Sequence, residues 1–140
     1  MKKLLTLFLL ATLTGCTSML TTLTEIKTGL DATASIGVAA FKIKCKGEVD
    51  KCVKNASQTL QTSSFDIPCP GWDKCNEQRD VFVTTLEQSY QLLDLTAYAS
   101  SAKNVEEAKA LLEKVKTSYS GVINLVNLYG LLEPLKKGKP

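Results

Sequence analysis

Residues 82–97 read FVTTLEQSYQLLDLTA, and this stretch decides the fold class. Its apolar residues recur every three or four positions, at Phe82, Leu86, Tyr90, Leu93 and Ala97. Steps of three and four place side chains on one face of an α-helix, whereas a half-buried strand alternates every second residue. The sequence therefore predicts a helix over residues 77–102, with Asn76 as its N-cap and the aromatic residues of the stripe in the core.

Two helices are predicted before this one. Apolar residues at helical spacing predict a helix over residues 19–44, although its many threonines lower the helix propensity. A shorter stripe predicts a second helix over residues 48–61. Residues 62–76 carry two prolines and a glycine, which predicts a loop stapled by cysteines.

A further helix is predicted near the C-terminus. Asn104 followed by Glu107 is typical of a capping box, and Gly130 is expected to end the helix that begins there. Because the connections are short, successive helices should be antiparallel neighbours. The predicted fold is an all-α, small antiparallel bundle of about four helices, in a single domain over residues 16–140 with a basic tail at 135–140.

Five cysteines cannot all pair within one chain, so one of them needs a separate role. The four central ones are disulfide candidates, namely Cys45, Cys52, Cys69 and Cys75. Turn residues inside both short segments, Gly47 in the first and Pro70-Gly71 in the second, favour local pairing, Cys45 with Cys52 and Cys69 with Cys75. An unbroken helix through 45–52 would instead hold the first two cysteines about 10 Å apart and require crossed pairing. A zinc site is disfavoured, since the spacing is wrong and the chain has no histidine.

The chain begins with a positive segment, Met1-Lys2-Lys3, followed by ten largely apolar residues at 4–13. This run is too short to span a bilayer, which takes about 20 residues, and its length and flanks suit a secretory signal peptide. The formal charge of +3 depends largely on this segment, which contains Lys2 and Lys3. Without these two lysines the chain has 15 basic and 14 acidic residues, a net charge of +1. A nucleic-acid partner is not expected, since no dense basic face is present.

The segment Leu13-Thr14-Gly15-Cys16 resembles the lipobox of bacterial lipoproteins. The resemblance implies that a diacylglycerol is attached to the thiol of Cys16 and that residues 1–15 are removed. Two or three acyl chains would hold the protein nearly permanently on a membrane. In the lipoproteins of Gram-negative bacteria, an aspartate directly after the cysteine commonly signals retention in the inner membrane. This chain has Thr17 there, which resembles the pattern of lipoproteins sent to the outer membrane. We therefore expect an outer-membrane lipid anchor, with the domain in the periplasm.

No catalytic set is recognisable. The absence of histidine excludes a Ser-His or Cys-His nucleophile, and there is no glycine-rich phosphate loop. Glu106 and Glu107 lie in a predicted first helical turn, where acids favour the helix dipole. Trp72, the single tryptophan, is interpreted chiefly as a core residue near the cysteines, with contact to a partner as the alternative.

These features predict a protein without enzymatic activity and without a cofactor. The first hypothesis is a lipid-anchored envelope protein that acts by protein–protein interaction, either as an accessory factor of an envelope machine or as an exclusion factor that blocks a receptor. The second is an immunity or inhibitor lipoprotein that neutralises a toxin or hydrolase in the periplasm. A carrier of an apolar ligand is a third, which would need a cavity between helices.

Overall fold

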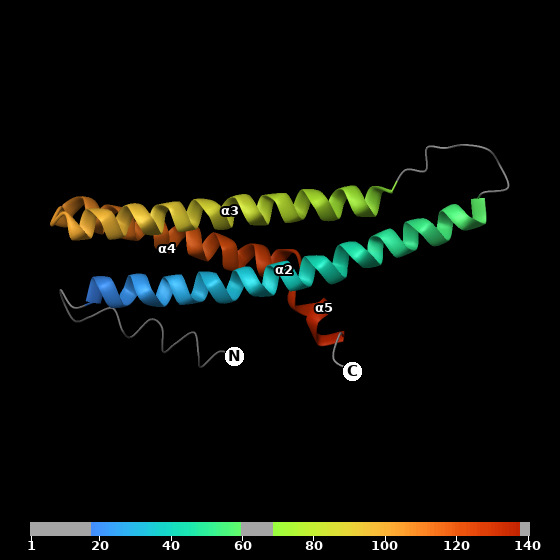
Figure 1. Ribbon diagram of the computed structural model, residues 1–140, viewed down its shortest axis with the longest axis horizontal. Helices are drawn as coiled ribbons and strands as arrows, with labels where there is room; N and C mark the ends of the chain where they lie inside the picture. Colours follow the sequence, from blue (N-terminus) through green and yellow to red (C-terminus); the bar gives the residue numbers. More distant parts are fainter. Residues whose placement is uncertain (1–17, 60–68, 138–140) are drawn as a thin grey trace.

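The structure, a computed structural model, describes residues 18–59 and 69–137. Its helices are α2 (Ser18–Thr59), α3 (Pro70–Ser101), α4 (Val105–Leu128) and α5 (Leu132–Lys137). α2 and α3 lie antiparallel along each other, and α4 returns beside them over only part of their length (Figure 1). The predicted all-α antiparallel bundle is confirmed. None of the described helices is long and apolar enough to span a bilayer.

α2 is one continuous helix, so the prediction of separate helices over 19–44 and 48–61 was wrong. Gly47 was interpreted as a turn residue, but it lies within the helix. A glycine in a helix interior costs about 1 kcal/mol relative to alanine, which a helix of 42 residues held to its neighbour can tolerate. The expected alternative of an unbroken helix through residues 45–52 is therefore the one that the structure adopts.

The disulfides follow from that continuity and join α2 to α3. Cys45 bonds Cys75 and Cys52 bonds Cys69, with Cα–Cα distances of 5.6 and 5.8 Å. Local pairing, which the turn residues favoured, was therefore wrong. The cysteines of α2 are two helical turns apart on one side, and the antiparallel partner presents its own pair in reverse order. This arrangement produces two successive cross-links between the helices.

α3 begins at Pro70 rather than at residue 77, so Asn76 lies inside the helix and does not cap it. Proline is well suited to the first helical turn, because its missing N–H would have no partner there. The carbonyl of Cys69 accepts hydrogen bonds from the backbone N–H groups of Trp72 and Asp73. Within the predicted loop at 62–76, residues 69–76 thus start a helix, and 62–68 lie outside the described residues.

The ends of α4 confirm the two capping predictions. Asn104 Oδ1 accepts a hydrogen bond from the backbone N–H of Glu107, and its Nδ2 donates to the Glu107 carboxylate. At the other end Gly130 has a φ of +60°, and the N–H of Leu131 returns to the carbonyl of Val126. This is the geometry of a Schellman stop, in which glycine takes the left-handed position without strain.

The hydrophobic core lies between α2, α3 and α4 (Figure 1). Its fully buried members include Leu30, Phe82, Val115, Val122 and Leu131. Beyond the reach of α4, α2 and α3 continue as a two-helix arm, made of residues 46–59 and 70–81. In the arm, Cys75 is the one residue that is buried among the side chains that the structure describes. Two disulfides, Cys45–Cys75 and Cys52–Cys69, cross-link the two helices at the base of the arm and within it.

Glycine allows α2 to approach its neighbours at two positions. A Cβ at Gly37 would overlap the ring of Phe82, and one at Gly29 would overlap the hydroxyl end of Tyr119. The two glycines are eight residues apart and offset by about 80° around α2, so that Gly29 faces α4 and Gly37 faces α3. Gly47, by contrast, faces open space.

This contrast yields a matched pair of substitutions. Gly37→Ala should destabilise the protein by about 1–3 kcal/mol, because the new methyl must displace a buried aromatic ring. Gly47→Ala should be neutral or stabilise by up to about 1 kcal/mol, since it adds helix propensity without a clash. Urea denaturation of both variants measures the difference. Equal stability of the two variants would contradict the close contact between Gly37 and Phe82.

Candidate binding groove between α2 and α3

An open groove of about 520 Å³ runs between α2 and α3 where the three-helix core passes into the arm. Seven of its lining residues come from α2 and five from α3, and none comes from α4 or α5. They are Gly37, Val38, Phe41, Lys42, Cys45, Lys46 and Val49, with Trp72, Arg79, Phe82, Val83 and Leu86. The volume is within the usual range for sites that bind small molecules or segments of a partner.

The groove opens on the face of the helix pair that α4 does not cover. Lys42 lines the groove, whereas Lys44, two residues on, points about 200° away around the helix. The Nζ of Lys44 reaches the carbonyl of Tyr129 at the end of α4, at 3.0 Å, and Gln78 Oε1 at 2.8 Å. The two lysines thus mark opposite faces, one packed by α4 and the other bare, in the sense that none of the described helices covers it.

The floor of the groove is apolar. Phe82 is 1% exposed, and its ring packs against Phe41 with centroids 5.7 Å apart. Above this floor, Val38 and Val83 remain 68% and 38% exposed. Valines left exposed beside a formed hollow are surface that a partner could remove from water.

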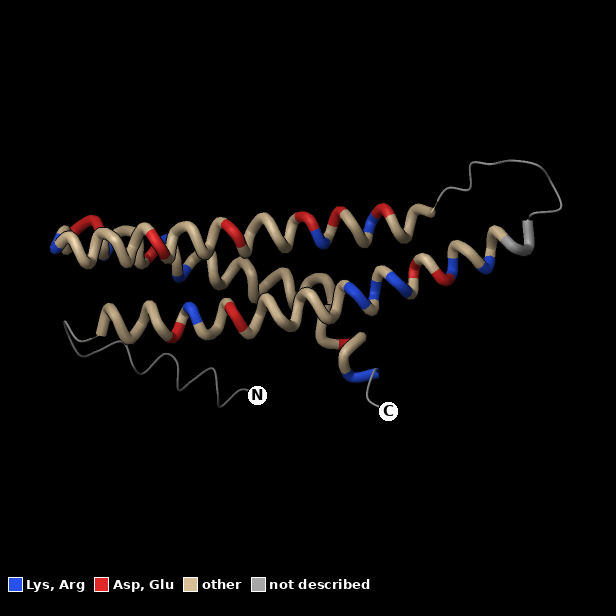
Figure 2. Tube along the Cα trace, viewed as in Figure 1, with Lys and Arg blue, Asp and Glu red and all other residues tan. Residues whose placement is uncertain are grey.

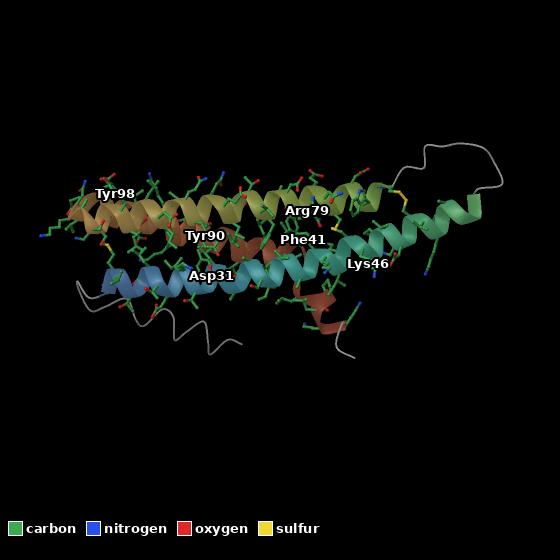
Figure 3. The ribbon with its side chains drawn as sticks, in the orientation of Figure 1. Asp31, Phe41, Lys46, Arg79, Tyr90 and Tyr98 are labelled. Atoms are coloured by element: carbon green, nitrogen blue, oxygen red, sulfur yellow. A yellow bond between two sulfur atoms is a disulfide. The ribbon has the colours of Figure 1, made fainter. Side chains whose placement is uncertain are left out.

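Both walls of the groove carry positive charge. Lys42 and Lys46 line the groove from α2 at a spacing of one turn, and Arg79 lines it from α3. Figure 3 labels Lys46 and Arg79 on these two helices. Arg79 contacts the neighbouring Asp80 at 3.3 Å, while the two lysines form no ion pair within residues 18–59 and 69–137. Basic residues are also frequent along the part of α2 that leads into the arm (Figure 2).

The lining consists mainly of apolar and cationic side chains. It contains no carboxylate or hydroxyl side chain, and its one cysteine, Cys45, is in a disulfide. Across the described ranges, no three histidine, cysteine, aspartate or glutamate side chains gather into a metal site. What the groove presents is apolar surface between cations.

Trp72 lies at the arm end of the groove and is 36% exposed, so its interpretation as a core residue was wrong. The early start of α3 explains its position, because Pro70 sets the helix before Trp72 and directs this side chain to the groove wall rather than inward. The alternative role, contact with a partner, stays a prediction. Cys16, the predicted lipidation site, lies outside the described residues.

Outside the groove, a polar cluster of Lys27, Asp31 and Tyr90 links α2 to α3. Figure 3 labels Asp31 and Tyr90 on these two helices. The Tyr90 hydroxyl donates to Asp31 Oδ1 at 2.5 Å, and Lys27 Nζ contacts Asp31 Oδ2 at 2.8 Å. The hydrogen bond from Lys27, followed by that from Tyr90, lowers the pKa of Asp31. Partial burial, and then the bond to Asp31, raises the pKa of Tyr90 to about 12.

This shift predicts a loss of stability at high pH. The folded chain keeps the Tyr90 proton up to about pH 12, whereas an unfolded tyrosine loses it near pH 10. The contribution of Tyr90 is therefore complete below about pH 10 and disappears as the pH approaches 12. Denaturation of the wild type and of Tyr90→Phe at several pH values should show a stability difference that shrinks over this interval. A constant difference would contradict the prediction.

The groove itself was missed from the sequence. Arg79, which lies on α3, was not singled out. Lys42 and Lys46 were not singled out either, because dividing α2 at Gly47 hid the face that they share with Val38 and Val49. Treating residues 18–59 as one helix would have placed these positions on one side. Of the predicted basic tail, residues 135–137 belong to α5, where Lys136 contacts Glu133, and 138–140 lie outside the described residues.

Comparisons with protein families, with curated proteins and with solved structures were made for the whole chain. No family model, no curated protein and no solved structure matches this chain.

Proposed function

We propose that this chain is a non-catalytic, lipid-anchored envelope protein that acts by binding a protein partner. The observation that carries the binding role is the bare groove between α2 and α3, with exposed apolar residues between cations. An accessory factor of an envelope machine and a receptor-blocking exclusion factor both act through such a surface. The lipobox at residues 13–16 supports the anchor, and the outer membrane is its proposed location.

The end of the bundle nearest the proposed anchor is compatible with a membrane surface. α2 begins at Ser18, and α3 ends beside that point (Figure 1). Leu20 and Tyr98 at this end are 73% and 74% exposed. Tyrosine is well accommodated at a membrane interface, where its apolar ring and its polar hydroxyl can both be satisfied, and an exposed leucine can enter the apolar layer.

Two measurements test the proposal. Cys16→Ser should abolish incorporation of labelled palmitate and release the protein from the membrane fraction; unchanged incorporation would overturn the anchor. For the binding role, a photo-crosslinking residue at Val83 in the full-length protein should give a defined adduct in intact cells. The same residue at Lys109, an exposed position on α4, should not. Adducts at both positions or at neither would overturn binding of a resident partner through this groove.

A further inference from the structure

We infer that the groove between α2 and α3 receives an amphipathic helix whose apolar stripe is flanked by acidic residues. This inference rests on the proposed function and specifies the chemistry of the partner. It follows from the bare face of the helix pair, from the length of the groove and from the distribution of its charges.

The shape of the site favours a helix. Along α2 the groove extends from Gly37 to Val49, about 18 Å, which is the length of roughly three helical turns. α4 already packs along the opposite face of the same two helices (Figure 1). A helix in the groove would therefore complete a four-helix arrangement, with its apolar stripe on Val38 and Val83.

The charges favour acidic flanks over a single anionic head group. Lys42 and Lys46 line one wall and Arg79 the other, so positive charge borders the apolar floor on both sides. A fatty acid would neutralise one cation at one end and leave at least one of the two lysines without a counter-charge among the described residues. A helix with glutamates on both sides of its stripe would face all three, and complementary charge of this kind sets partner choice and association rate.

Trp72 supplies a direct signal for occupancy. It is the only tryptophan in the chain, it lines the groove, and it is 36% exposed. The probe is a 15-residue helical peptide without tryptophan, with leucines at positions i, i+3, i+4 and i+7 and glutamates on both flanks. Its binding to the purified full chain should shift Trp72 emission to shorter wavelength, saturably and at a 1:1 ratio.

Matched peptides and variants separate the alternatives. A peptide with lysine in place of glutamate should bind at least about tenfold more weakly, and so should one with its leucines replaced by serine. Lys42→Glu/Lys46→Glu should weaken the acidic peptide by about tenfold or more. The control Lys109→Glu/Lys114→Glu makes the same charge change on exposed positions of α4 and should leave binding unchanged.

A charge swap keeps the test independent of folding defects. The lysine-flanked peptide should gain affinity for Lys42→Glu/Lys46→Glu, which a misfolded variant could not produce. Equal binding of acidic and basic peptides would overturn the inference. So would a Trp72 shift produced by oleate or anionic vesicles but not by the peptide, or one that depends only on the concentration of the protein itself.

The peptide test is separate from the test of the proposed function. Since it uses purified protein, it does not depend on lipidation or on a cellular partner. A crosslinked partner at Val83 combined with failure of the acidic peptide would overturn only this inference and retain the proposed function.

Discussion

Replacing Phe82 by alanine should lower the free energy of unfolding by about 3–5 kcal/mol, the usual cost of removing a buried aromatic ring. Phe82 is 1% exposed, packs on Phe41 and fills the space that Gly37 leaves open. In a domain of this size the melting temperature should fall by roughly 10–20 °C. Thermal unfolding followed by circular dichroism under oxidising conditions measures the effect.

A second substitution shows whether the loss comes from the contact with α2. Phe82→Leu should cost less than Phe82→Ala, because the apolar volume is largely kept. If Gly37 is small because the ring needs the space, then Gly37→Ala should cost less in the Phe82→Leu background than in the wild type. A double-mutant cycle measures this coupling. Strict additivity would contradict the direct contact, and a Phe82→Ala loss below about 1 kcal/mol would contradict its place in the core.

Removing the Cys45–Cys75 bond should have the second large effect, a loss of about 3.5–4 kcal/mol on the chain-entropy estimate. Both cysteines are buried at the boundary between the three-helix core and the arm. Cys45→Ala/Cys75→Ala should therefore loosen the core contacts next to Phe82 as well as the arm. Hydrogen exchange measured residue by residue should show protection falling on both sides of the removed bond.

The other disulfide provides the matched comparison. Cys52→Ala/Cys69→Ala removes the outer cross-link, where the described neighbours are exposed or half-buried. Loss of protection should then be confined to the arm, residues 46–59 and 70–81, and α4 should stay protected. If the two double variants gave the same exchange pattern, the arm would not be a separate unit of stability.

Local chemistry explains which parts of the fold could be predicted from the sequence. The stripe through Phe82, Leu86 and Tyr90 predicts a helix because its period belongs to the helix itself. The cap at Asn104 and the stop at Gly130 need only a few neighbouring residues. The fold class was accessible for these reasons, and so was the cross-linking of the four central cysteines, although not its pattern.

The remaining features depend on contacts distant in the sequence. Gly47 favours a turn when only its neighbours in the sequence are considered. The cross-links to α3, which hold this part of α2 in place, form only when the two helices pack in antiparallel order. Trp72 was interpreted as a core residue because the start of a helix at Pro70 was not recognised from the sequence. The groove combines both effects, since one wall belongs to a helix that was predicted as two, and Trp72 on the other wall belongs to a segment that was predicted as a loop.

The unbroken course of α2 also limits where a partner can be met. With a lipid on Cys16, two residues before Ser18, the groove between Gly37 and Val49 lies within a radius of about 55 Å of the anchoring point. A rigid helix keeps this radius nearly fixed, whereas a linker of the same length would sample a wide range of distances. For the proposed anchor and the proposed helical partner, candidates can therefore be sorted by how far their acidic helix stands from the membrane.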